Sequence, residues 1–140
     1  MATVHSSSFI VKTEGFTDVH NITEKVNEIL RHSPLTRGIA TVFISGSTAG
    51  VTTIEYEPGA VEDLKKAIER IAPRNLHYDH DARWGDGNGF SHVRASLLGP
   101  SLTLPFSDRH LQIGTWQQLI LVDFDNRPRT REILVQLVGE

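Results

Sequence analysis

The chain contains no cysteine, which excludes a disulfide scaffold, a cysteine-ligated zinc site and a thiolate nucleophile. Long hydrophobic runs are also absent: the longest aliphatic run, residues 119–122, is far shorter than the ~18 residues that span a bilayer. Segment 1–8 has no basic residue ahead of its first apolar cluster, so we expect no targeting signal, no membrane partner and a cytoplasmic protein. Any bound metal must be held by histidine, carboxylate or amide groups.

A marked excess of charge of either sign is missing as well. The 14 lysines and arginines face 17 aspartates and glutamates, with a net charge of −3 at pH 7 and no block of like charges. This balance disfavours non-specific binding to nucleic acid, so we expect no nucleic-acid partner. With 140 residues, 39% of them hydrophobic, and no repeat or linker, the chain is expected to form a single domain over 1–140.

Two stretches have the spacing of amphipathic helices. An asparagine followed three residues later by a glutamate precedes an apolar stripe, which predicts a helix over 22–32. Pro58 and Pro73 bracket a second apolar stripe, which predicts a helix over 58–71.

Strand-like segments occupy most of the remaining chain. Residues 38–45 are apolar at both alternating sets of positions, which predicts a central strand buried on both faces. Together the elements predict an α+β domain with a mixed β-sheet and two main helices. Further strands are expected over 4–12, 51–57, 91–98, 101–106, 110–113, 117–124 and 131–138.

Segment 75–89 loses apolar periodicity and is rich in histidine, aspartate and glycine, which is typical of a long functional loop. His77 and His80 lie in this loop, and His92 lies on the strand expected after it. Imidazole nitrogens bind divalent ions, so we expect a metal site, with zinc first and magnesium or manganese as alternatives. The spacing matches no standard zinc motif, and ordinary surface or core histidines are the competing interpretation.

Three other segments carry polar groups suited to a substrate. The GSTAG turn at 46–50 has small residues and hydroxyls that can meet an anion, or it is a plain tight turn. The GTWQQ segment at 114–118 can stack on and hydrogen-bond to a heterocycle, or its tryptophan covers the core. Alternating arginines at 127–131 bind phosphate or form surface ion pairs. The candidate substrate-binding residues are Ser47, Thr48, Trp116, Gln117, Gln118 and Arg129, and the candidate catalytic carboxylates are Glu55 and Asp86.

Gln117 and Gln118 are neighbours on a predicted strand, so their side chains point to opposite faces of the sheet. A buried amide without partners costs about 1–3 kcal/mol. We therefore expect one amide to fasten the GSTAG turn or the histidine loop, and the other to lie nearer a pocket.

The chain resembles the YjbQ-like family, also called the secondary thiamine-phosphate synthase family. The resemblance rests on LLGPS at 97–101, QIGTWQQ at 112–118 and FDNRPRTR at 124–131, and it extends from about residue 3 to 140. The residues that match the histidine motif of the family are Tyr78, His80, Asn88 and His92.

This resemblance implies a mixed sheet with packed helices, a homotrimer around a threefold axis and a metal pocket at the histidine motif. It gives His80 and His92 the role of ligands by direct match, and His77 by proximity. We therefore expect a metal-binding homotrimer with a phosphorylated small-molecule substrate. The alternatives are a transferase that joins a pyrimidine diphosphate to a thiazole phosphate, as in thiamine-phosphate synthesis, and a metal-dependent hydrolase.

Two positions depart from the pattern of the family. Gly46 stands at the start of the GSTAG turn, where many members carry a histidine. If that histidine serves as ligand or base elsewhere, this chain must replace it, for example with His77, or lack the function. Arg109 stands where the family usually has a glycine in a hairpin, and a non-glycine residue fits there only with negative φ or with tolerated strain.

Overall fold

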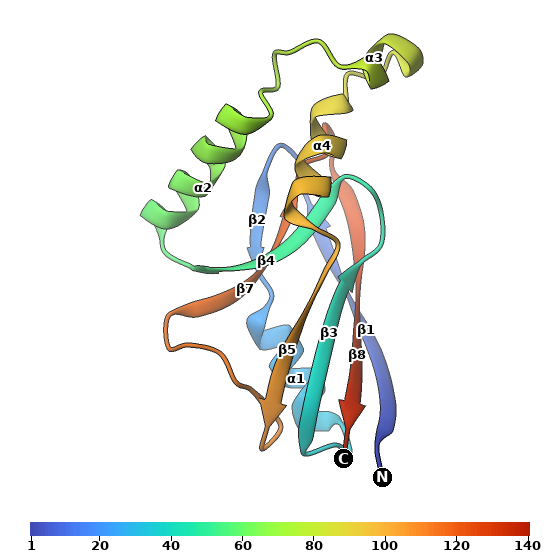
Figure 1. The fold of residues 1–140 in the computed structure, drawn as a ribbon, viewed down its shortest axis with the longest axis vertical. Coiled ribbons are helices and arrows are strands. Elements are labelled where there is room, and N and C mark those ends of the chain that lie inside the picture. The colour runs from blue at the N-terminus through green and yellow to red at the C-terminus, as the bar shows by residue number, and fades with distance from the viewer.

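The computed structural model describes residues 1–140, and every paired strand in it is antiparallel to its neighbours (Figure 1). The expectation of a mixed sheet is therefore wrong. A parallel pair needs a long crossover between neighbouring strands, whereas the long helical connection here leaves one sheet and enters the other. The larger sheet has five strands in the order β1 (Thr3–Thr13), β8 (Arg129–Gly139), β3 (Arg37–Ile44), β5 (Ser101–Ser107) and β6 (His110–Leu111).

The smaller sheet has three strands, β2 (Asp18–Asn21), β7 (Gln117–Asp123) and β4 (Ala49–Glu55), with β7 in the middle. Strand β7 is buried on both faces, because Leu119 and Leu121 face the main core while Ile120 and Val122 face a second core. We expected two-sided burial for residues 38–45, and that prediction is wrong. One face of β3 is open, since Ile39 and Phe43 are 46% and 39% exposed.

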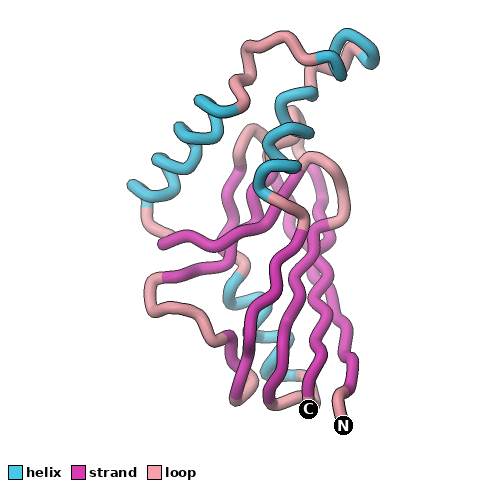
Figure 2. Tube along the Cα trace, viewed as in Figure 1, coloured by secondary structure: helices cyan, strands magenta, loops and turns pink.

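Four helices accompany the sheets, and three of them gather at one end of the molecule (Figure 2). The predicted helices are confirmed as α1 (Thr23–His32) and α2 (Pro58–Ile71). Helix α1 packs on the main core through Val26 and Leu30. No helix is long and apolar enough to cross a membrane.

The other two helices, α3 (Asp79–Trp84) and α4 (Gly89–Leu98), were not predicted. The strand expected over 91–98 is wrong, and His92 therefore lies on a helix. Its buried neighbours Phe90, Arg94 and Ala95 recur at helical rather than alternating spacing, so one side of α4 faces the second core.

The turn between β5 and β6 resolves the question raised by Arg109. Asp108 and Arg109 both adopt positive φ, at 53° and 58°, which is the geometry of a tight hairpin turn. Arg109 is held by its backbone N–H, which donates to the carbonyl of Thr36 at 3.1 Å, and by its Nε, which donates to the carbonyl of Ser33 at 3.3 Å. These contacts offset strain of about 1–3 kcal/mol.

A buried ion pair connects the two sheets. The carboxylate of Asp123, at the end of β7, accepts hydrogen bonds from Arg131 Nε at 2.7 Å and Nη2 at 2.9 Å on β8. It also accepts from the hydroxyl of Thr13 on β1 at 2.5 Å. All three side chains are buried, with Asp123 fully so. Because the donors belong to one sheet and the acceptor to the other, the pair fixes how the sheets meet.

We predict that Arg131→Met lowers the free energy of unfolding by about 3–5 kcal/mol, because it leaves the carboxylate of Asp123 buried without its cation. Urea denaturation at pH 7 measures the loss. The matched control is Arg31→Met, which removes an exposed pair with Glu24 and should change stability by less than about 0.5 kcal/mol. Equal losses in both variants would contradict this account of Asp123.

Candidate metal centre and adjoining pocket

Helix α3 and the loop after it bring one imidazole and two carboxylates together. One ligand atom each from His80, Asp81 and Asp86 lies within 4.8 Å of the others. Nδ1 of His80 is 3.3 Å from a carboxylate oxygen of Asp86 and 3.8 Å from one of Asp81. This nitrogen is buried and makes no hydrogen bond within the chain. An unpartnered buried imidazole nitrogen beside two carboxylates is the donor set that a divalent cation needs.

The local backbone explains why these groups converge. Helix α3 ends at Gly85, whose φ of 68° is left-handed, and the chain turns back so that Asp86 faces the helix it has just left. Oδ1 of Asp81 accepts a hydrogen bond from the N–H of Gly89 at 2.8 Å, and Oδ1 of Asp86 accepts one from the N–H of Asn88 at 3.2 Å. In each carboxylate the oxygen that lies near His80 is the one that accepts the backbone hydrogen bond, so the backbone fixes the oxygens that are presented to His80.

Of the predicted histidines, His92 lies against the ring of His80 without being one of the three residues whose ligand atoms converge, and His77 lies apart from them. The rings of His80 and His92 are 4.3 Å apart between centroids, so α4 places His92 directly against the cluster. The side chain of His77 is 78% exposed, and its nearest carboxylate is that of Asp79, at 3.6 Å. Sequence reasoning missed Asp81, although its place beside His80 in the DHD triplet was a usable signal.

Asn88 connects the cluster to the segment between β7 and β8. It is buried, and its Oδ1 accepts hydrogen bonds from the hydroxyl of Ser91 at 2.6 Å and from the N–H of Asn126 at 3.1 Å. Asn126 in turn donates from Nδ2 to the carbonyl of Asp86 at 2.8 Å. The loop that carries Asp86 is therefore anchored to the segment between β7 and β8.

A cavity of about 200 Å³ lies between the GSTAG turn and α4. The turn and His92 thus line one pocket, although 45 residues of chain lie between Gly46 and His92. Ser47 and Ser96 have exposed side chains at its wall. The lining residues are Gly46, Ser47, Ala49, His92, Ala95, Ser96 and Pro100.

Two predicted substrate-binding residues beside this pocket are engaged in internal contacts. The buried hydroxyl of Thr48 donates to Asp125 at 2.8 Å and accepts from Arg131 Nη2 at 2.6 Å. Arg129 Nε donates to the same carboxylate at 3.0 Å. Burial alone would raise the pKa of Asp125, but the hydrogen bonds from Thr48 and Arg129 outweigh it, so the pKa lies below its ordinary value.

The remaining predicted site residues lie at the other end of the smaller sheet. Ala49 pairs with Asp123 near the pocket, whereas Glu55 pairs with Gln117 six residues further along the strand, about 20 Å away. Trp116, next to Gln117, is 73% exposed. The structure therefore does not bring Glu55 or the GTWQQ segment to the histidine group.

The two adjacent glutamines also have different partners from those expected. Nε2 of Gln117 donates to the hydroxyl of Thr53 on β4 at 3.0 Å, and Oε1 of Gln118 accepts from Asn21 on β2 at 3.1 Å. Their side chains do diverge, but they fasten β7 to its two neighbouring strands. The expectation that one of them holds the GSTAG turn or the histidine loop is wrong.

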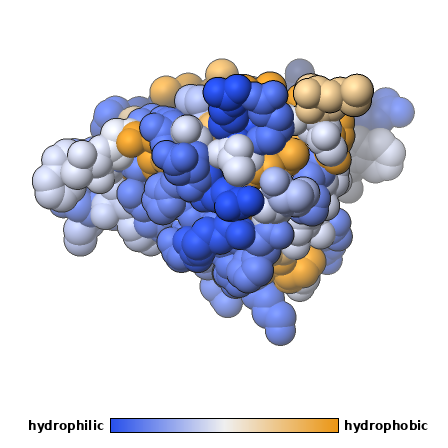
Figure 3. Space-filling view, turned by 90° about the horizontal axis from the view of Figure 1, so that it is seen from below, coloured by the Kyte–Doolittle hydropathy of each residue, from blue (hydrophilic) through white to orange (hydrophobic).

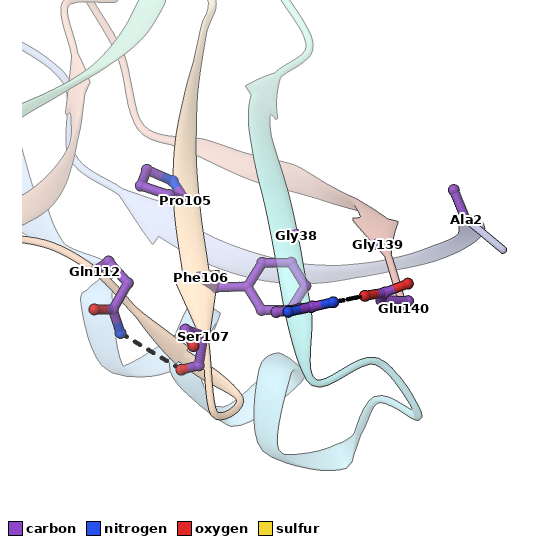
Figure 4. A pocket seen from close by; sticks show the side chains of 9 residues that line it. Ala2, Gly38, Pro105, Phe106, Ser107, Gln112, Gly139 and Glu140 are labelled. Carbon is purple, nitrogen blue, oxygen red and sulfur yellow. Dashed lines mark hydrogen bonds and ion pairs between the residues drawn. The ribbon is translucent and has the colours of Figure 1, made fainter.

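The largest cavity, of about 520 Å³, lies at the end of the molecule where both termini meet. That end is mostly hydrophilic, with separate hydrophobic patches (Figure 3). Figure 4 shows Glu140 and Gln112 on either side of Phe106 in this cavity. It is lined by the strand ends opposite α3 and α4, and it contains no histidine. The cavity is therefore separate from the His80 group.

These features define the class of protein. It is a small α+β fold of two antiparallel sheets, with a candidate cation site of histidine and aspartate side chains next to a small pocket. The sequence profile described as "UPF0047 protein YjbQ-like" matches residues 7–140. The chain belongs to this family, which confirms the resemblance drawn from the sequence motifs.

Relatives and solved structures agree with this assignment. A UPF0047 protein of Methanothermobacter thermautotrophicus is 32% identical over 137 residues, covering 98% of this chain and 94% of the relative. A crystal structure of a YbjQ-like protein of unknown function from Sulfolobus solfataricus superposes with a TM-score of 0.93, at 29% identity and full coverage of both chains. A YjbQ/UPF0047 protein of Clostridium acetobutylicum superposes with a TM-score of 0.84 at 30% identity, covering 92% of this chain and 97% of the other.

We predict that Thr48→Val lowers the free energy of unfolding by about 1–3 kcal/mol at pH 7, because Asp125 loses a hydrogen-bond donor in a buried site. The lowered pKa of folded Asp125 contributes stability that is complete above the unfolded pKa, near ~3.9, and is lost as pH falls through the folded pKa. The loss of the hydroxyl raises the folded pKa, so the deficit of the variant should shrink as pH falls below about 4.

Urea denaturation of both proteins from pH 7 to pH 3 measures this deficit. Thr36→Val is the matched control, because its exposed hydroxyl donates only to the carbonyl of Glu140, at 3.0 Å. A deficit for Thr48→Val that stays constant over this pH range would show that Asp125 does not depend on the hydroxyl.

Proposed function

We propose that the protein binds a divalent metal ion at His80, Asp81 and Asp86, with His92 as the adjacent fourth donor. The observation that carries this proposal is the buried, unpartnered Nδ1 of His80 beside two carboxylates. A buried polar atom without a partner costs about 1–3 kcal/mol, and a cation would supply the missing interaction. No other group of histidine and carboxylate ligand atoms in the chain converges in this way.

The donor set fits zinc first and manganese second. Two imidazoles and two carboxylates supply the nitrogen and oxygen atoms common in zinc sites, whereas an all-oxygen set would suit magnesium better. The backbone N–H groups of Asn88 and Gly89 hold the two carboxylates, in the manner of the outer partners that orient metal ligands.

The neighbouring pocket supports a small anionic ligand for this site. Its volume of about 200 Å³ is below the ~300–1,000 Å³ of pockets that hold drug-sized molecules. A transferase that joins two phosphorylated heterocycles would therefore need a neighbouring chain to complete its site. Hydrolysis of one small phosphorylated or acyl compound fits better, and Asp81 and Asp86 are the carboxylates nearest to the histidines. A bound divalent ion would supply positive charge that polarises a phosphoryl or carbonyl oxygen.

The protein is also proposed to assemble as a homotrimer through the open face of the five-stranded sheet. Ile39, Phe43 and Leu134 on this face are 38–46% exposed, and Val4 on the edge strand is 61% exposed. Phe43 pairs with Leu134 and Ile39 with Val138, and the polar pair of Thr41 and Gln136 lies between these two apolar pairs. Exposed apolar side chains gathered on one sheet face are typical of an association site.

We predict that His80→Ala and Asp86→Asn each weaken Zn²⁺ binding by at least about tenfold, because each removes a donor from the cluster. Isothermal titration of the full-length protein with Zn²⁺ gives the affinity and the stoichiometry. The matched control is His77→Ala, which removes an exposed imidazole outside the cluster and should bind Zn²⁺ as the wild type does. Loss of binding in His77→Ala but not in His80→Ala would place the metal elsewhere.

We predict that Phe43→Glu dissociates the assembly, because it places a charge in an exposed apolar pair of the proposed interface. Light scattering after size exclusion should give three times the chain mass of 15.6 kDa for the wild type and a single chain mass for the variant. Leu76→Glu, at an exposed position outside the sheet, should leave the mass unchanged. A wild-type mass of 15.6 kDa would refute the trimer.

A further inference from the structure

The guanidinium of Arg131 has one nitrogen left over from the buried ion pair. Nε and Nη2 make all of its hydrogen bonds, to Asp123 and to the hydroxyl of Thr48. Nη1 makes none, yet it is not among the buried unpartnered atoms, so solvent reaches it. The side chain as a whole is only 9% exposed. A fixed cationic donor therefore presents a single free edge to solvent.

That free edge lies at Gly46. A Cβ built on Gly46 would be 2.9 Å from Nη1, and no other atom outside the adjoining residues lies within 4 Å of it. The φ of Gly46 is +120°, a conformation that side chains rarely adopt. Any side chain at this position would occupy the space over Nη1. The glycine of this chain leaves it open.

We propose that Gly46 uncovers an oxyanion subsite in which Nη1 of Arg131 binds the phosphoryl group of a small ligand. Gly46 borders Nη1 and lines the pocket together with Ser47 and Ser96, whose hydroxyls supply further donors. The subsite rests on the proposed function, because the pocket that Gly46 lines is also lined by His92. It identifies the ligand class of the metal site as small phosphorylated compounds.

The electrostatics of the subsite favour selective binding of an anion rather than high affinity for it. Arg131 pairs with Asp123 and Arg129 pairs with Asp125, so these four buried or partly buried charges balance. The ion pair also fixes the guanidinium, so little side-chain entropy is lost when an anion binds. Arg129, the arginine singled out from the sequence, uses its Nε–H to donate a hydrogen bond to Asp125. In the proposed subsite it is Arg131 that donates a hydrogen bond to the phosphoryl group.

Inorganic phosphate titrated into the metal-free, full-length protein tests the subsite, with ³¹P NMR and calorimetry as readouts. Gly46→Ala should weaken phosphate binding at least about tenfold, the effect of one lost charge-assisted contact, and leave Zn²⁺ affinity unchanged. The matched control is Gly99→Ala, which has a φ of +100° and open space around its Cβ. It carries the same backbone strain and should bind phosphate as the wild type does.

The double variant Ser47→Ala and Ser96→Ala provides a second test that leaves the backbone of Gly46 intact, and it should weaken phosphate binding severalfold. His80→Ala should lose Zn²⁺ and retain phosphate. Phosphate binding by a wild type that fails to bind Zn²⁺ would refute the metal site and leave the subsite standing. Absence of phosphate binding in the wild type, unchanged binding in Gly46→Ala, or loss of phosphate in His80→Ala would overturn the subsite.

Discussion

The buried ion pair between Asp123 and Arg131 is the interaction on which the rest of this structure depends. Asp123 ends the central strand of the small sheet, and its carboxylate accepts hydrogen bonds from Arg131 and Thr13 in the large sheet. A buried charge is tolerated only when its partner has good geometry, so the pair permits one relative placement of the two sheets. Both faces of β7 are buried as a result, because each of them is then covered by a core.

The same polar network extends from this pair to the candidate metal centre. Thr48 links Arg131 to Asp125, and Asn126, the next residue, fastens both Asn88 and the carbonyl of Asp86. The loop that bears Asp86 is therefore attached to this buried network. Precise placement of metal ligands needs such supporting contacts, since side chains on an unattached loop would sample many arrangements.

Part of the fold and part of the site follow directly from local sequence pattern. Helices α1 and α2 were predicted because their apolar stripes are bounded by an asparagine or by prolines. His80 and His92 were singled out by motif, and the structure brings their rings together. Helix α4 was missed because its buried side carries the polar residues Ser91 and Arg94, and the guanidinium of Arg94 finds its partners in Ala72 and Thr17, far away in the sequence.

The sequence by itself determined the type of most elements, the absence of cysteine chemistry and the imidazoles available to a metal, since these depend on composition and short-range spacing. The tertiary structure alone decided that both sheets are antiparallel, that Asp81 replaces His77 beside His80, and that Glu55 lies about 20 Å from the pocket. It also uncovered Nη1 of Arg131 at Gly46. These outcomes depend on which strands pair and which buried charges find partners, and such long-range contacts leave no periodic trace along the chain.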